Sequence, residues 1–163
     1  MSDYDSTDLK PGNGKSLQVE AIKDGVVIDH IPATQGVKII KSLNLFASKV
    51  RIAVGFNLPS KMMGLKDLIK IEHRQFNEQE VNRLAIFAPN ATINVIADYK
   101  VVQKTKMSLP SSIHGLFICP NSNCISHNEP VTSSFHLSER QGQTILQCHY
   151  CEKSFKLDIF AEI

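Results

Sequence analysis

Apolar and polar residues alternate along the chain with two distinct periods, and the shorter period comes first. Residues 17–23 alternate between apolar and polar residues, which is the period-two pattern of a half-buried strand, and an extended run resumes at residues 26–28 after the Asp24-Gly25 turn signal. The same pattern predicts further strands at residues 49–58 (ended by Pro59-Ser60), 65–71, 91–96 and 99–104.

The helical period appears twice between these strands. The first helix follows Ile31-Pro32 and has Thr34 as its predicted N-cap. Its apolar stripe consists of Val37, Ile39, Ile40 and Leu43. The second helix begins at Asn77, with Glu80 three residues later in a capping-box pattern. Its predicted buried face, before Pro89, consists of Val81, Leu84, Ala85 and Ala88.

The order of these elements predicts the fold. Strand, helix, strand, strand, helix and strand, with one more strand at the end, is the split βαβ, ferredoxin-like arrangement of two helices on one face of an antiparallel sheet. Residues 108–112 interrupt the periodicity, and the cysteines follow on short strands and turns. We therefore expect an α+β protein with a small all-β C-terminal domain of the zinc-ribbon or rubredoxin-like type. The expected divisions are a disordered tail (1–16), a sheet domain (17–107), a linker (108–114) and a cysteine domain (115–163).

Composition narrows the class of protein. The chain has 163 residues, of which 42% are hydrophobic and 21% charged, enough for one sizeable core or two small ones. No apolar run reaches the roughly 18–20 residues that span a bilayer, and the polar N-terminus lacks the apolar core of a signal peptide. These features predict a cytoplasmic protein without a membrane partner, in a compartment where thiols stay reduced.

Charge is divided unevenly along the chain. Residues 1–110 carry 15 Lys and Arg against 11 Asp and Glu, whereas residues 111–163 carry 3 against 5. A nucleic-acid-binding module needs a basic face that neutralises phosphates, and the cysteine segment is mildly acidic. A protein–protein contact fits this segment better. The residues that flank its predicted ligand turns are Asn121, Asn123, Glu152 and Lys153.

The four cysteines form two close pairs, Cys119-x4-Cys124 and Cys148-x2-Cys151, separated by a hairpin-sized segment. Four thiolates that converge tetrahedrally suit Zn²⁺, with each sulfur ~2.3 Å from the ion. Because four protein ligands leave no open coordination position, the ion is expected to be structural. It would supply much of the folding energy of a segment that is small for a core of its own.

Other interpretations of the cysteines are weaker. Two disulfides would suit a secreted protein, and a redox pair at Cys148 and Cys151 would leave the other two cysteines unexplained. An iron centre of the rubredoxin type uses similar ligands, and the spacing alone does not distinguish it from zinc. His127 or His149 could replace a cysteine, but with four cysteines available neither is expected to contact the ion.

Residues 65–71 place two ammonium groups on one face of a strand. Alternation puts Lys66, Leu68 and Lys70 on the same side, where like charges repel unless an anion lies between them. Lys104, at the end of the last predicted strand, joins them if the strands are neighbours. Two interpretations follow: a phosphate-binding site, or a solvated sheet edge protected by lysine.

The sequence contains no arrangement typical of catalysis. Its glycines are scattered and match neither a Walker nor a Rossmann pattern. No serine or cysteine nucleophile has an evident base, because the predicted metal accounts for all four cysteines. The chemistry of these residues therefore indicates binding.

Specific motifs occur in both predicted domains. In the N-terminal part they are Leu17-Gln-Val-Glu-Ala-Ile, Val27-Ile-Asp-His-Ile-Pro-Ala33, Asn57-Leu-Pro-Ser, Lys66-Asp-Leu-Ile-Lys-Ile-Glu72 and Leu109-Pro. In the C-terminal part they are Cys119-Pro-Asn-Ser-Asn-Cys-Ile-Ser-His127 and Cys148-x-Tyr-Cys-Glu-Lys153. From residue 17 to the C-terminus the chain resembles the regulatory chain of bacterial aspartate carbamoyltransferase. It departs from that family in its N-terminal extension.

The resemblance implies a non-catalytic subunit of pyrimidine biosynthesis. In such a subunit, residues 17–107 would bind nucleotide effectors: CTP as inhibitor, UTP as its assistant and ATP as activator. Regulatory chains of this family pair as homodimers, and three dimers link two catalytic trimers into a dodecamer. The zinc-binding domain (115–163) would contact the catalytic chains.

Carried over residue by residue, the resemblance also implies the effector site. The base and ribose contacts would be Val19, Glu20, Ala21, Ile22, Val27, Asp29, Asn94, Ile96, Tyr99 and Val101. The phosphate contacts would be His30, Lys66, Lys70 and Lys104, whose mutual repulsion the phosphate charge would offset. The rival hypotheses are a zinc-ribbon protein that contacts nucleic acid and a thiol redox protein.

Overall fold

The computed structural model describes residues 19–162, so the predicted tail (1–16) lies outside the described residues. The N-terminal part of this range contains β1 (Gly25–Pro32), α1 (Gly36–Ser42), the 3-10 helix η1 (Leu45–Ala47), β2 (Ile52–Ser60), β3 (Gly64–Glu72), α2 (Glu78–Phe87), β4 (Thr92–Ala97) and β5 (Lys100–Lys106). The C-terminal part contains β6 (Ser112–His114), η2 (Ile125–His127), β7 (Ser134–Arg140), β8 (Gln143–Cys148), β9 (Ser154–Lys156) and η3 (Leu157–Glu162). No helix in the described range is long and apolar enough to span a membrane.

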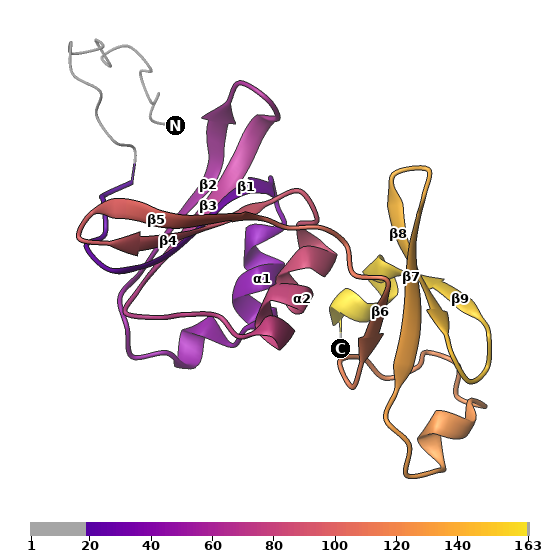
Figure 1. Cartoon of the computed structure of the whole chain (residues 1–163). Helices are drawn as coiled ribbons and strands as arrows, with labels where there is room; N and C mark the ends of the chain where they lie inside the picture. Colours follow the sequence, from indigo (N-terminus) through magenta and orange to yellow (C-terminus); the bar gives the residue numbers. More distant parts are fainter. Residues whose placement is uncertain (1–18, 163) are drawn as a thin grey trace, which may run out of the picture.

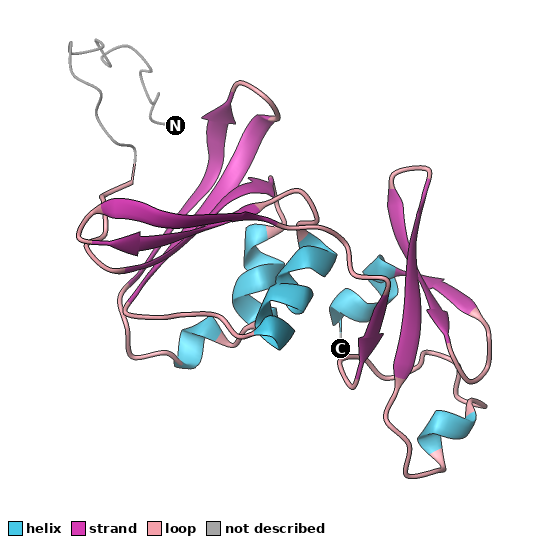
Figure 2. Ribbon diagram, viewed as in Figure 1, coloured by secondary structure: helices cyan, strands magenta, loops and turns pink. Residues whose placement is uncertain are grey.

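The N-terminal elements form one antiparallel sheet with the strand order β2-β3-β1-β4-β5. Helices α1 and α2 lie side by side against one face of this sheet (Figures 1 and 2). The C-terminal elements form a second antiparallel sheet, β6-β7-β8-β9. The predicted α+β fold, with a ferredoxin-like sheet followed by a small all-β unit, is confirmed. Strand β6 lies within the range expected for the linker.

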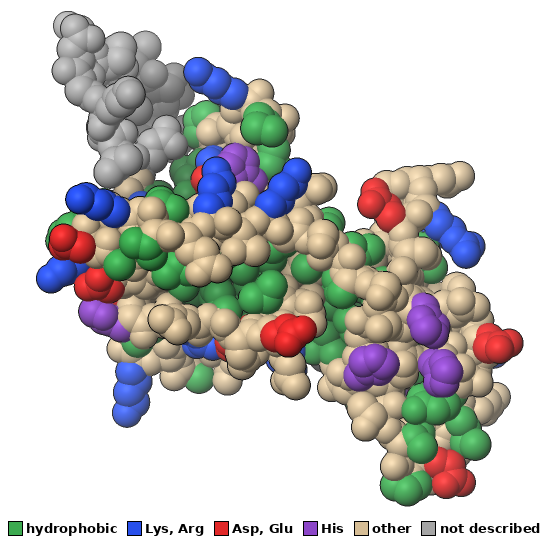
Figure 3. All heavy atoms as spheres, in the orientation of Figure 1, with side chains coloured by type: hydrophobic (Ala, Val, Ile, Leu, Met, Phe, Trp, Pro, Cys, Tyr) green, Lys and Arg blue, Asp and Glu red, His purple; other side chains and the backbone are tan. Residues whose placement is uncertain are grey.

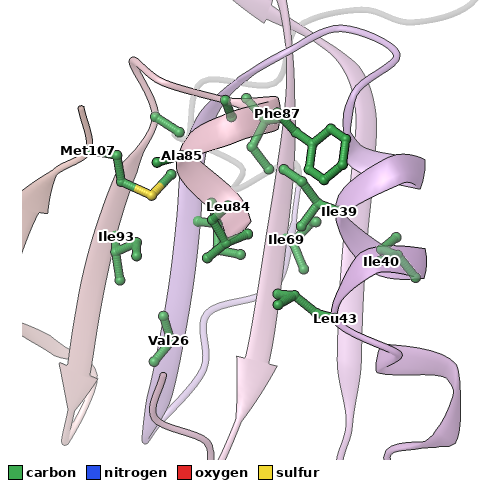
Figure 4. Packing of buried hydrophobic residues seen from close by; sticks show 14 of the residues in the cluster. Val26, Ile39, Ile40, Leu43, Ile69, Leu84, Ala85, Phe87, Ile93 and Met107 are labelled. Carbon is green, nitrogen blue, oxygen red and sulfur yellow. The ribbon is translucent and has the colours of Figure 1, made fainter. Parts of the chain in front are cut away.

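The main core lies between the sheet and the two helices. The alternation predicted for β3 is present, because Asp67, Ile69 and Ile71 are fully buried while Lys66 and Lys70 remain partly exposed. Figure 4 shows the side chains of the sheet meeting those of α1 and α2. The members of this core labelled there are Val26, Ile39, Ile40, Leu43, Ile69, Leu84, Ala85, Phe87, Ile93 and Met107.

A second core fills the C-terminal unit and includes one residue of α2. Ile86 is 1% exposed and packs with Phe135, Leu146 and Phe160 of the C-terminal unit. The Phe117 ring lies 4.9 Å from that of Phe160, centroid to centroid, and Phe117 packs against both cores. The two sheets are therefore joined by apolar contacts at the end of α2 as well as by the chain.

The strand predicted at residues 17–23 is wrong over the described residues 19–24, which form bends and coil. The Lys70 Nζ donates to the carbonyls of Val19 and Glu20, so a side chain takes the groups that a neighbouring strand would need. Strand β1 starts at Gly25 and continues past the predicted residue 28 to Pro32. Gly25 is required at its start, because a Cβ there would lie 2.1 Å from the Ile71 carbonyl oxygen.

The predicted N-cap of the first helix is also wrong. Helix α1 starts at Gly36, and its N-cap residue Gln35 makes no side-chain capping bond. Thr34 instead lies in the preceding turn with a φ of 79°. The Gly36 N–H donates to the Asp67 carboxylate across the core, 3.1 Å away. The side chain of Asp67 thus caps α1 from a distant position in the sequence, and no local sequence pattern reveals this contact.

Two further expectations fail for tertiary reasons. Val37, assigned to the buried stripe of α1, is 42% exposed. Pro59 does not end the preceding strand, because β2 continues to Ser60. Strand β2 is an edge strand, where one side has no ladder partner and the missing proline N–H is tolerated.

Helix α2 begins with the predicted capping box. The Asn77 side chain accepts from the Glu80 N–H at 2.9 Å, and the Glu80 carboxylate accepts from the Asn77 N–H at 3.1 Å. Glu80 also pairs with Arg74 at 2.6 Å. Because α2 carries residues of both cores, its start is a sensitive position for stability.

We expect Asn77→Ala to lower the free energy of unfolding by about 1 kcal/mol, because the Glu80 N–H loses its acceptor. Urea titration of the metal-loaded protein measures this loss. Gln79→Ala, an exposed position on the same turn, is the matched control and should change stability by less than about 0.5 kcal/mol. Equal losses in the two variants would contradict the role of the cap.

Candidate metal centre and binding face

The four cysteine sulfurs converge at one point of the C-terminal unit. All four Sγ atoms lie within 4.8 Å of one another, and the Cys119–Cys151 and Cys124–Cys148 pairs are each 3.7 Å apart. Sulfurs held ~2.3 Å from a tetrahedral ion lie about 3.8 Å apart, whereas a disulfide requires about 2.05 Å. The residues present therefore fit a tetrahedral metal ion, as the spacing predicted.

Short turns place these cysteines. The Cys124 N–H donates to the Asn121 carbonyl at 2.9 Å, which folds the first loop back on itself. Cys148 ends β8, and the Glu152 N–H donates to its carbonyl at 3.0 Å, with Glu152 at a φ of 56°. Cys119, Cys124 and Cys148 are buried among the apolar side chains of the second core.

The surroundings shift the pKa values of the four thiols in opposite directions, lowering those of Cys124 and Cys151 and raising those of Cys119 and Cys148. Burial opposes ionisation of Cys124, but hydrogen bonds from the Ser126 hydroxyl and backbone N–H outweigh it and lower the pKa of Cys124 to about 6. Burial raises the pKa of the Cys119 thiol. His127 Nε2 lies 2.9 Å from the Cys119 carbonyl oxygen, and the His149 ring packs against Tyr150. Neither histidine belongs to the converging group.

The predicted lysines align across the outer face of the first sheet, which is the face opposite the helices. In the register of the strands, Lys70 lies opposite Val27, Val27 opposite Asn94, and Asn94 opposite Lys104. Lys70 and Lys104 thus end one row that crosses four strands, with their Cα atoms about 14 Å apart at the usual strand spacing. Lysine side chains from both ends can reach toward the middle of this row.

A second group on the same face surrounds the bend in β1. The Lys66 Nζ donates to the Asp29 carboxylate at 2.7 Å, and the backbone N–H of His30 donates to the same oxygen at 2.6 Å. Burial would raise the pKa of Asp29, but these hydrogen bonds and the charges of Lys66 and His30 outweigh it and lower that pKa. His30 Nδ1 is buried, and nothing in residues 19–162 hydrogen-bonds to it.

The segment before β1 closes over one end of this face. The Lys70 Nζ lies 2.9 Å from the Val19 carbonyl and 2.7 Å from that of Glu20, and burial lowers the pKa of Lys70 despite the nearby Asp29 and Glu20 charges. The Tyr99 N–H, in the turn between β4 and β5, donates to the Lys23 carbonyl at 2.9 Å. The Lys70 side chain therefore ties residues 19–20 to β3, and a backbone hydrogen bond ties Lys23 to the β4–β5 turn.

The structure brings most of the predicted effector residues together around this face. A second row lies closer to the β4–β5 turn. In it, Gly25 lies opposite Ile96, and Ile96 lies opposite Val101. Tyr99 and Val101 are largely exposed, whereas Ile22 is buried, 7% exposed. Sequence reasoning missed Lys106, which lies opposite Thr92, itself opposite Asp29. The two-residue spacing from Lys104 could have revealed it.

Cations dominate the outer face. Within the described residues, Lys66 pairs with Asp29, while neither Lys70, Lys104 nor Lys106 forms an ion pair. Figure 3 shows Lys and Arg side chains along the side of the sheet away from the helices. Such a face suits a ligand that carries several negative charges.

Comparisons with known proteins match both domains of the chain. Residues 17–108 match the family model described as the aspartate carbamoyltransferase regulatory chain, allosteric domain, and residues 111–161 match the metal-binding domain of the same chain. The chain is 57% identical over 148 residues to the aspartate carbamoyltransferase regulatory chain of Tolumonas auensis, covering 91% of this chain and 96% of the relative. The like-named chain of Aeromonas hydrophila is 57% identical over 146 residues, covering 90% and 95%, and that of Vibrio cholerae is 54% identical over 147 residues, covering 90% and 95%.

The two matched domains, an allosteric domain followed by a metal-binding domain, are those of a non-catalytic regulatory subunit. The chain belongs to the aspartate carbamoyltransferase regulatory chain family, as the resemblance of its motifs indicated.

We expect Cys119→Ser to abolish stoichiometric metal binding and to unfold the C-terminal sheet, because this unit has a small core to which three of the cysteines belong. Elemental analysis would fall from one metal ion per chain, and NMR spectra would lose the C-terminal resonances while those of the first sheet persist. Ser122→Ala, an exposed position in the same loop, should retain the metal. A folded C-terminal unit without metal in Cys119→Ser would contradict the assignment.

Proposed function

We propose that this chain is the allosteric subunit through which nucleotides regulate aspartate carbamoyltransferase in de novo pyrimidine biosynthesis, in the cytoplasm. CTP, ATP and UTP bind the outer face of the first sheet. A structural Zn²⁺ held by Cys119, Cys124, Cys148 and Cys151 stabilises the C-terminal unit, which contacts the catalytic chains. The functional divisions are a nucleotide-binding domain (17–107), a linker (108–114) and a zinc-binding contact domain (115–163).

The row that joins Lys70 to Lys104 carries this proposal. A nucleoside triphosphate supplies several negative charges in a chain of phosphates, which two ammonium groups at opposite ends of a row can hold together. Charge-assisted hydrogen bonds to phosphate are stronger than those that Lys70 now makes to neutral carbonyls, so a triphosphate can displace the carbonyls of residues 19–20. Lys66 and His30 extend the phosphate contacts.

The nucleoside would lie beside the phosphates, toward the β4–β5 turn. The segment before β1 is coil, so its backbone groups are not committed to a sheet ladder and can recognise the edge of a base. Val27 and Ile96 offer apolar surface to the base or ribose, and Asn94 offers an amide. The proposed base and ribose contacts are Val19, Glu20, Ala21, Ile22, Val27, Asp29, Asn94, Ile96, Tyr99 and Val101.

The surface of the C-terminal unit supports a protein partner. Ile118, Ile125 and Val131, which lie beside the first cysteine loop, are 60%, 54% and 40% exposed. Residues 111–163 carry 3 Lys and Arg against 5 Asp and Glu, which disfavours the nucleic-acid alternative. We assign the catalytic chain as partner, in a dodecamer of two catalytic trimers and three regulatory homodimers. Strand β5, an exposed sheet edge, supports pairing with a second copy.

Regulation would work through a two-state equilibrium of the assembly. A nucleotide shifts that equilibrium only by its differential affinity for the two states, and typical coupling is about 1–3 kcal/mol, or fivefold to 150-fold in apparent affinity. The shared core around Ile86 connects α2 of the nucleotide-binding sheet to the zinc unit. It supplies a rigid contact through which the two units can move together.

We expect the chain to co-purify with an aspartate carbamoyltransferase catalytic chain, and CTP and ATP to change the apparent aspartate affinity of that complex but not of the catalytic trimer alone. Activity assays of both preparations measure this. Cys119→Ser should prevent assembly, since the contact surface surrounds the metal loop. A stable complex whose apparent aspartate affinity changes with neither CTP nor ATP would overturn the proposed function.

We expect Lys70→Ala to weaken CTP binding about tenfold to a hundredfold, the range for loss of one hydrogen bond to a charged group, while assembly stays intact. Calorimetry on the full complex measures the affinity. Lys70→Ala also removes the hydrogen bonds to the carbonyls of residues 19–20. Lys104→Ala removes a proposed phosphate contact alone, because Lys104 forms no hydrogen bond to residues 19–20. Lys41→Ala, exposed on α1 across the sheet, is the matched control and should bind CTP normally.

A further inference from the structure

Two β-bulges lie on opposite sides of β3 at adjacent positions. The register with β1 shifts between Ile28 and Ile31, and the register with β2 shifts between Gly55 and Leu58. Each bulge contains a residue other than glycine in the left-handed region, His30 with a φ of 60° and Asn57 with a φ of 54°. Such backbone conformations persist only where the surroundings hold them.

A carboxylate accepts the free backbone N–H of each bulge. Asp29 accepts from His30 at 2.6 Å, and Asp67 accepts from Asn57 at 3.0 Å. The two carboxylates lie on opposite faces of the sheet, because Asp29 meets Lys66 on the outer face whereas Asp67 is buried among the helix-side residues. Lys66, whose side chain contacts Asp29 in the β1 bulge, and Asp67, which accepts from Asn57 in the β2 bulge, are consecutive residues of β3. One peptide unit of β3 therefore connects the two bulges.

Asp67 holds three elements at once. Its second oxygen accepts from the Gly36 N–H at 3.1 Å, so the carboxylate joins β3, the β2 bulge and the start of α1. It is 0% exposed and forms no ion pair within residues 19–162, and its two oxygens accept from backbone N–H groups, as a buried polar group requires. The space around it is closed, since a Cβ on Gly36 would lie 3.0 Å from the Asp67 oxygen and 3.0 Å from the Phe56 ring.

We infer that Asp67 is a positioning residue for Lys66 and His30, the proposed phosphate contacts on the opposite face of the sheet. It fixes the β2 bulge and the strand β3 beside Lys66, and thereby the place at which Lys66 meets Asp29 and His30. This inference rests on the proposed function, because it assigns a role in nucleotide binding to a residue that no nucleotide can touch. Loss of the carboxylate should weaken contacts to the phosphates more than those to the nucleoside, of which only Asp29 meets Lys66.

The test compares CTP with CMP, which share a base and ribose but differ by two phosphates. Calorimetry on the full chain gives the ratio of the two dissociation constants. In Asp67→Asn the amide cannot accept both backbone N–H groups, and we expect the preference for CTP over CMP to fall about tenfold. Ile69→Val, fully buried on the same face of β3, should lower stability without changing this preference.

Gly36→Ala displaces the same carboxylate without removing it, and the substitution favours helix formation. It should lower the CTP preference in the same direction, by a smaller factor, even if Asp67→Asn fails to fold. An unchanged preference in a folded Asp67→Asn, or in Gly36→Ala, would overturn the inference. A wild-type chain that binds neither nucleotide would refute the proposed function instead.

Discussion

The alternation of side chains along β3 is the constraint on which the N-terminal sheet depends. One face of this strand supplies Ile69 and Ile71 to the core, and the other displays Lys66 and Lys70. A shift of one residue would bury both lysines and expose both isoleucines, at a cost of several kcal/mol. Packing against α1 and α2 therefore fixes the register, and the fixed register places Lys70 of β3 and Lys104 of β5 in one row across the sheet. The core and the lysine-bearing outer face both follow from the alternation along β3.

The C-terminal unit depends on a different interaction. The core of this unit consists largely of three buried cysteines and a few aromatic residues. This apolar surface is too small to stabilise one folded state unless a metal ion crosslinks the sulfurs. Phe117 and Leu157 pack against both cores, and Ile86 of α2 is buried in the second. Loss of the metal would thus remove the surface against which the end of α2 packs. The same unit therefore depends on the metal for folding and connects to the first sheet through α2.

Much of the molecule could be predicted because its signals are local. The capping box at Asn77 and Glu80 needs only a spacing of three residues, and the cysteine pairs need only spacings that let sulfurs converge. The alternation that placed Lys66 and Lys70 on one face is equally local, and it required the strand order to bring Lys104 into their row. The family motifs supplied the proposed ligand class, because spacing alone left open the choice between a phosphate site and a solvated edge.

The failures have a common physical origin in contacts between residues far apart in sequence. Residues 19–23 alternate like a strand, but the Lys70 ammonium takes two of their carbonyls, and Thr34 looks like an N-cap although Asp67 fills that role from 31 residues beyond Gly36. The sequence by itself determined the element types, the metal ligands and the two faces of β3, because each follows from a short period or spacing. Only the tertiary structure decided the two bulges and the burial of Asp67, because the carboxylate that accepts the Asn57 N–H also accepts the Gly36 N–H, and these groups meet only once β2, β3 and α1 are packed together.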